Sequence, residues 1–138
     1  MSDTSVLNIL LVDDQNANLV LLSQYIENSD FYIDTATSAS IALQKLHSQK
    51  FDIVFLDLIM PEMSGMELLK IIKSTDDFKD LFVVIVSAVS QPQLLSEAFN
   101  LGASDFVKRP IDRIELLARM KAVIRTKLQE DELKRLNE

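Results

Sequence analysis

The chain has 138 residues, 48% of them hydrophobic, which suits one domain with an ordinary core and makes a second domain unexpected. It contains no cysteine, which excludes disulfides and thiolate metal sites, and its formal net charge of −7 argues against non-specific nucleic-acid binding. No apolar run approaches the roughly 20 residues of a bilayer span, and the start lacks the features of a signal peptide, so we expect a cytoplasmic protein that contacts neither membranes nor nucleic acid directly.

The first part of the chain alternates between strand and helix patterns. A short apolar run typical of an interior parallel strand ends at the acidic pair Asp13-Asp14. A helix with apolar residues at helical spacing follows, then a more polar strand expected at a sheet edge, then a second helix. The four predicted elements are residues 8–12, 16–28, 31–36 and 39–47.

The stretch from Phe51 to Glu67 carries the most informative pattern. Residues 53–56 are apolar and predict a strand buried on both faces, and Asp57 follows where that strand ends. Pro61 prevents the strand from continuing, because proline cannot donate to a sheet ladder. Ser64 and Glu67 then have the spacing of a capping box that begins a helix. The stretch is therefore predicted to be strand, acid, loop and helix.

The remaining chain repeats the alternation twice. The run 81–86 is strongly β-branched and predicts an interior strand that ends at Ser87. A capping box at residues 90–93 predicts a helix that stops at Gly102, and residues 105–108 form a short strand that ends at Arg109-Pro110. Asp112 and Glu115 are expected to cap a fifth helix, which continues through residues 127–138 because no glycine or proline interrupts it.

Five strand-helix units predict an α/β fold in which helices cover both faces of a parallel sheet. Ligands of such sheets bind outside the carboxyl ends of the strands. Polar residues follow four of the predicted strands at these ends, so we expect them to converge on one edge of the sheet. They are Asp13, Asp14, Asp57, Ser87 and Arg109.

Four motifs, LLVDD, FLDLIMPEMSG, VIVSA and GASDFVKRP, occur in an order and spacing that resemble the receiver domain of bacterial two-component response regulators. The resemblance covers about residues 7–125. It implies a flavodoxin-like three-layer (βα)5 fold with a five-stranded parallel sheet of order 2-1-3-4-5. Residues 1–125 would form the receiver domain, and residues 126–138 would extend the fifth helix as a linker to an output domain or a dimer partner.

The resemblance also implies the chemistry. Asp57 would accept a phosphoryl group from a histidine kinase or a phosphotransfer protein, in a chain that is a switch rather than an enzyme with a separate substrate. Asp13, Asp14, Asp57 and the backbone carbonyl of Ile59 would hold Mg²⁺. A hard divalent cation suits this cluster, because neighbouring carboxylates otherwise raise one another's pKa.

Three further positions would respond to the phosphoryl group. Ser87 would hydrogen-bond it, Phe106 would rearrange with Ser87, and Arg109 stands where the family normally has lysine. Arginine keeps the charge but is bulkier and forks onto phosphate, so the exchange is not neutral. Ile59 and Val89 are apolar where family members often place polar residues near the attacking water, which predicts slow hydrolysis of the phosphoryl-aspartate.

Two other functions compete with a phosphorylation switch. A pseudo-receiver that binds proteins or dimerises without phosphorylation is kept open by Arg109. A hydrolase with an aspartyl nucleophile is disfavoured, because such phosphatases typically carry a second aspartate where Ile59 stands. A P-loop enzyme is excluded, because the sequence has no glycine-rich loop with lysine. The switch would alter the face formed by the fourth helix, fifth strand and fifth helix, through which a homodimer is also expected.

Overall fold

A computed structural model describes residues 7–88 and 91–137 of the chain. Strands and helices alternate through it, as the sequence predicts. In chain order the elements are β1 (Leu7–Val12), α1 (Asn16–Ile26), β2 (Phe31–Ala36), α2 (Ala39–Ser48), β3 (Ile53–Leu56), α3 (Gly65–Ser74), β4 (Phe82–Ser87), α4 (Pro92–Leu101), β5 (Asp105–Lys108) and α5 (Arg113–Leu136).

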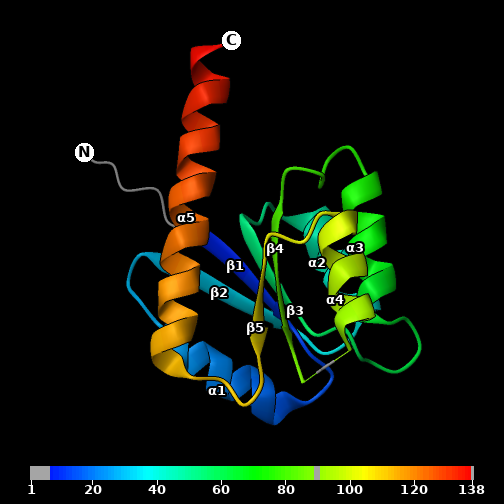
Figure 1. Ribbon diagram of the computed structural model, residues 1–138. Coiled ribbons are helices and arrows are strands. Elements are labelled where there is room, and N and C mark those ends of the chain that lie inside the picture. Colours follow the sequence, from blue (N-terminus) through cyan, green and yellow to red (C-terminus); the bar gives the residue numbers. More distant parts are fainter. Residues whose placement is uncertain (1–6, 89–90, 138) are drawn as a thin grey trace.

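The five strands form one parallel sheet of order β2-β1-β3-β4-β5, which confirms the predicted flavodoxin-like fold. Helices α1 and α5 cover one face and α2, α3 and α4 cover the other (Figure 1). Side chains along each strand alternate between the two layers: Leu10 and Val12 pack toward α2 to α4, whereas Ile9 and Leu11 pack toward α1 and α5. Burial on both faces explains why the inner strands are continuous apolar runs.

Besides shifts of one residue at the start of β1 and the end of α2, three predicted elements differ from the structure at their ends. Helix α1 ends at Ile26, because Glu27 has a non-helical backbone, with φ −54° and ψ 129°, and the Asn28 side chain accepts the N–H of Asp30 in a local turn. Helix α4 begins at Pro92 after Gln91, which makes no side-chain capping bond; the predicted cap Ser90 lies outside the described residues. The predicted strand 81–86 is displaced by one residue and includes Ser87.

The predicted caps of α3 and α5 can be compared directly. Ser64 accepts the N–H of Glu67, and the Glu67 carboxylate accepts the N–H of Ser64, so the predicted capping box is confirmed. At α5 only half of the prediction holds. Asp112 accepts the N–H of Ile114, but the Glu115 carboxylate pairs with Arg119 one turn along the helix instead of reaching back.

The loop after β3 depends on a glycine at the start of α3. The Gly65 N–H donates to the carbonyl of Leu58 over 2.9 Å, which holds the helix start against the loop. A Cβ atom at this position would lie 1.9 Å from the carbonyl oxygen of Asp57. Only glycine allows this close approach, and the contact ties α3 to the residue that follows β3.

Helix α5 is much longer than the others and extends well beyond the sheet (Figure 1). Its body-facing stripe is apolar at Leu116, Met120 and Val123 and becomes charged at Lys127. None of the helices in the described ranges is long and apolar enough to cross a bilayer.

Candidate functional site

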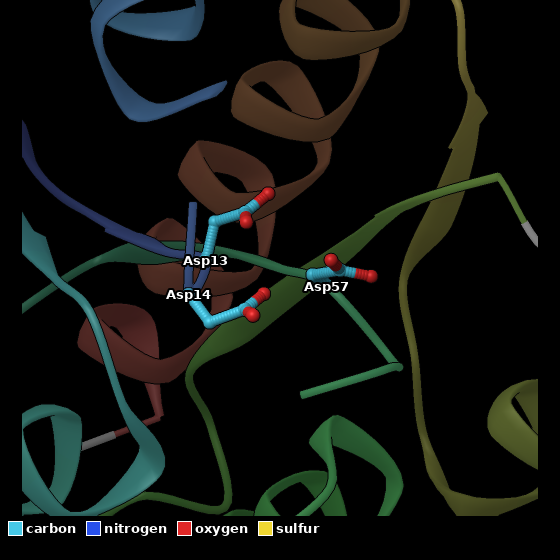
Figure 2. Close-up of side chains that lie close together, drawn as sticks. All are labelled: Asp13, Asp14 and Asp57. Atoms are coloured by element: carbon cyan, nitrogen blue, oxygen red, sulfur yellow. The ribbon is translucent and has the colours of Figure 1, made fainter. Parts of the chain in front are cut away.

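Asp13, Asp14 and Asp57 meet at the carboxyl edge of the sheet (Figure 2). Val12 is the register partner of Leu56, so β1 and β3 end level with one another and their following residues are neighbours. A hydrogen bond from the Asp57 N–H to the Val12 carbonyl, 3.1 Å long, continues the ladder past the last paired residues. One carboxylate oxygen from each of the three acids lies within 4.8 Å of the others.

Asp13 is held by groups on both of its oxygens. Its Oδ1 accepts the N–H of Gln15 over 2.9 Å and the side-chain amide of Asn18 over 3.4 Å. Its Oδ2 accepts from the Nη2 of Arg109. The side chain is 3% exposed, so this carboxylate depends on these donors for the solvation that water would otherwise supply.

Arg109, which directly follows β5, brings a positive charge into the acidic cluster. Besides its contact with Asp13, its Nη1 lies 3.4 Å from the Oδ2 of Asp57. Lys108, the preceding residue, is exposed, which agrees with the alternation of side chains along a strand. The guanidinium, rather than the neighbouring ammonium, is therefore the cation of this site.

Burial raises the pKa of Asp57 above the ordinary value of 3.8, and the negative charge of Asp13 raises it further. The backbone N–H of Ile59, the Arg109 charge and a hydrogen bond with Ser87 act in the opposite direction but do not cancel the effect. The sequence pointed to repulsion between carboxylates as the cause of a raised pKa; removal from water is the larger cause.

The remaining predicted residues lie at different distances from the chemistry. Ser87 is buried at the end of β4 and hydrogen-bonds Asp57. The N–H of Ile59 donates to Asp57 Oδ1 over 3.2 Å, and the Ile59 side chain is largely exposed. Phe106 is apart from the acids: it is paired in register with Ile85 and packs half-buried on the α2 to α4 side. Val89 lies outside the described residues.

The three acids suit a hard cation that prefers oxygen ligands. Two oxygens bound to one Mg²⁺ lie at most about 4.2 Å apart, because Mg–O distances are about 2.1 Å. A spread of up to 4.8 Å needs only a small side-chain adjustment, or one ligand that binds through a retained water. The donor set therefore fits magnesium, and it contains no nitrogen or sulfur ligand that would favour zinc.

Comparison with known proteins decides the family. The sequence model described as the response regulator receiver domain matches residues 9–121. The chain belongs to this family. Receiver domains of response regulators are phosphoacceptors in two-component signalling, typically bind Mg²⁺ at an acidic pocket, interact with histidine kinases and are often linked to output domains.

Curated relatives are longer than this receiver. The heme response regulator HssR of Staphylococcus saprophyticus is 37% identical over 116 residues, which are 84% of this chain and 50% of that protein. A protein of Vibrio cholerae named as a probable cyclic di-GMP phosphodiesterase is 34% identical over 139 residues, 100% of this chain and 31% of its own length. The chain thus spans between about a third and a half of these relatives, and the activity in the second name belongs to that larger protein.

Solved structures share the fold. The signal receiver domain of an HD domain-containing protein from Pseudomonas fluorescens superposes with a TM-score of 0.83 at 27% identity, over 89% of this chain and 98% of that one. A CheY-like receiver domain protein from Methanospirillum hungatei gives 0.83 at 25% identity, over 91% and 99%. These similarities agree with the strand order found here.

Three residues near the site were not singled out from the sequence. Gln15 and Asn18 hold Asp13, and Gly65 allows α3 to approach Asp57. The glycine follows a serine with capping potential, which was the available signal. The contacts of Gln15 and Asn18 have no local signal, because polar residues are common at the start of any helix.

Proposed function

We propose that this receiver is a phosphorylation-controlled switch in which Asp57 accepts the phosphoryl group. The observation that carries the proposal is the meeting of Asp13, Asp14 and Asp57 within 4.8 Å beside Ser87 and Arg109, at the sheet edge where such folds bind ligands. An Asp57 oxygen attacks phosphorus, the N–P bond of a kinase or carrier phosphohistidine breaks, and the ring nitrogen that leaves takes a proton from water.

Asp13, Asp14 and Asp57, with the Ile59 carbonyl, would hold Mg²⁺, which offsets the negative charge of both partners during phosphoryl transfer. The chain's own residues do the rest. Ser87 already hydrogen-bonds Asp57 and would move to the phosphoryl oxygens, and Arg109 would pair with them. Phe106, a β5 residue that packs half-buried on the α2 to α4 side of the sheet, would follow Ser87 and change the α4-β5-α5 face.

The wider assignment rests on the longer relatives. Residues 1–125 act as the receiver, and residues 126–138 continue α5 toward an output domain, which is supported by the match of the Vibrio cholerae protein across the whole chain. Phe99 of α4 is exposed and supports a homodimer through the α4-β5-α5 face. Exchange with a histidine kinase is expected in the cytoplasm.

Phosphorylation by a small acyl phosphate tests the central claim. The chain is incubated with Mg²⁺ and acetyl phosphate, and intact mass is recorded for the wild type, Asp57→Asn and Asp76→Asn. Asp76 is a matched control because its side chain is 97% exposed and lies outside the site. We expect one phosphoryl group on the wild type and on Asp76→Asn and none on Asp57→Asn. An unmodified wild type would favour the alternative, a binding module that works without phosphorylation, which Arg109 in place of lysine keeps open.

A further inference from the structure

The Arg109 guanidinium lies between two of the carboxylates that a metal ion requires. Its Nη2 donates to Asp13 Oδ2 and its Nη1 is 3.4 Å from Asp57 Oδ2. All three side chains are largely buried, with 17%, 3% and 11% of their surfaces exposed for Arg109, Asp13 and Asp57. Water screens these charges only weakly, so the positions of the cations inside the site control its energy.

A metal ion and Arg109 would have to bind the same carboxylate oxygen of Asp13. Asp13 Oδ1 is already engaged by the N–H of Gln15 and the amide of Asn18. Asp13 Oδ2 is the remaining oxygen, and it is the one that Arg109 holds. A divalent cation on this oxygen would stand within a few ångströms of the guanidinium, and the two positive charges would repel one another because Asp13 and Arg109 are largely buried.

We propose that Arg109 is a built-in competitor of Mg²⁺ for Asp13, and that the guanidinium leaves Asp13 when the metal binds. The inference rests on the proposed function, because it takes the acidic cluster as the metal site. In the metal-free chain Arg109 supplies the positive charge that makes the cluster tolerable. Metal binding replaces it and releases a guanidinium beside Asp57, where the phosphoryl group arrives.

The residue type is essential to this arrangement. A guanidinium presents donors in a rigid fork and spans two carboxylates, as Arg109 does between Asp13 and Asp57. An ammonium is a single point charge and strongly hydrated, so it would hold Asp13 less firmly from the same position. We therefore expect Mg²⁺ to bind more tightly when this position carries lysine, and most tightly when it carries a neutral side chain.

Mg²⁺ titration calorimetry on the full chain measures the competition. The variants are Arg109→Gln, Arg109→Lys and the control Lys108→Gln, which removes the same charge from the exposed neighbouring residue. Relative to the wild type, we expect Arg109→Gln to bind Mg²⁺ at least about tenfold more tightly, Arg109→Lys to lie between, and Lys108→Gln to change affinity less than about twofold. Equal affinity for the wild type and both Arg109 variants would overturn the inference.

A spectroscopic measurement reports on the Arg109 guanidinium itself. The arginine Nε–H resonance that disappears in the NMR spectrum of Arg109→Lys belongs to Arg109. When the wild type is titrated with Mg²⁺, this resonance should shift, and the midpoint of the shift should give the same Mg²⁺ affinity as calorimetry. The resonances of Arg119 and Arg135, which pair with other carboxylates, serve as internal controls. An Arg109 resonance unchanged at saturating Mg²⁺ refutes displacement even if the affinities differ.

The two proposals fail in different ways. If neither the wild type nor Arg109→Gln binds Mg²⁺, the metal site itself is wrong and the competition falls with it. If both bind equally and the wild type is phosphorylated on Asp57, the proposed function stands and only the competition is lost. The wild-type resonance supplies a result even if Arg109→Gln does not fold.

Discussion

Gly65→Ala should damage both the stability and the chemistry of the receiver, because a methyl group at this position collides with the acceptor residue. The added Cβ would lie 1.9 Å from the Asp57 carbonyl oxygen and 2.7 Å from the Leu58 Cα. Ordinary contact begins at 3.4 Å, so the oxygen and the methyl group must separate by about 1.5 Å. Both partners are fixed to backbone, and neither can rotate away.

The surrounding hydrogen bonds make that separation costly. Asp57 is tied to β1 by its N–H bond to Val12, and Gly65 is tied to the loop by its N–H bond to Leu58. Overpacking costs about 1–3 kcal/mol, and the loss of one hydrogen bond adds about 1 kcal/mol. We therefore expect Gly65→Ala to lower the free energy of unfolding by about 2–4 kcal/mol, a large fraction of the roughly 5–15 kcal/mol of an ordinary domain.

Urea unfolding followed by circular dichroism measures the stability, and acetyl phosphate with intact mass measures the chemistry. Gly102→Ala is the matched control: its φ of 114° makes alanine unfavourable, but its Cβ would meet only the flexible Lys73 side chain. The control should lose about 1–2 kcal/mol and keep its phosphorylation rate. Gly65→Ala should also be phosphorylated at least about tenfold more slowly, because Asp57 is displaced. An unfolding free energy within about 0.5 kcal/mol of the wild type would refute the argument.

Three further predictions follow from individual contacts. In Mg²⁺-free buffer the raised pKa of Asp57 lets the folded chain keep a proton that the unfolded chain loses near pH 3.8. The free energy of unfolding should therefore fall as pH rises above about 3.8. Urea unfolding at several pH values measures this dependence, and Asp57→Asn should remove the part that comes from Asp57. Changing Ile59 and Val89 to asparagine should shorten the lifetime of the phosphoryl group, which is followed by intact mass after acetyl phosphate is removed. An unchanged lifetime would contradict the prediction that these apolar residues slow hydrolysis. Lys127→Gln should speed the hydrogen exchange of amides 128–136 about fivefold, because the ion pair between Lys127 and Asp52 contributes about 1 kcal/mol. The control Lys121→Gln, at an exposed position of the same helix, should leave these exchange rates unchanged.

The sequence predicted the parts of the fold that depend on local pattern. Apolar runs gave the strands, and the capping box at Ser64 gave the start of α3, because these signals arise from residues within a few positions of one another. Asp57 could be placed at the sheet edge because it directly follows an apolar strand. Helix α4 begins at Pro92, in agreement with a proline in its first turn, whereas the predicted cap Ser90 lies outside the described residues and stays a prediction.

The contacts inside the site were beyond sequence reasoning. Arg109 was expected at the edge of the sheet, but its bond to Asp13 joins residues 96 positions apart and depends on the rotamer of a long side chain. The close approach of Gly65 to Asp57 depends likewise on the path of the whole loop. Periodicity and capping motifs carry no information about such distances. The sequence therefore indicated which residues take part in the chemistry but not how they contact one another.

Helix α5 runs from the carboxyl ends of the strands to their amino ends. It begins soon after Arg109 at the acidic edge and, with 24 residues, spans about 36 Å to beyond the opposite edge (Figure 1). There Lys127, with 10% of its side chain exposed, lies 3.8 Å from Asp52, the residue that precedes β3. Ile124 is the last apolar residue of α5 that packs against the core. Beyond it, the described contacts with the body are the ion pairs of Lys127 and Lys134 and the Lys127 ammonium over the Phe82 ring. The proposed output domain would be joined to the receiver through this extension, whose direction relative to the body these contacts fix.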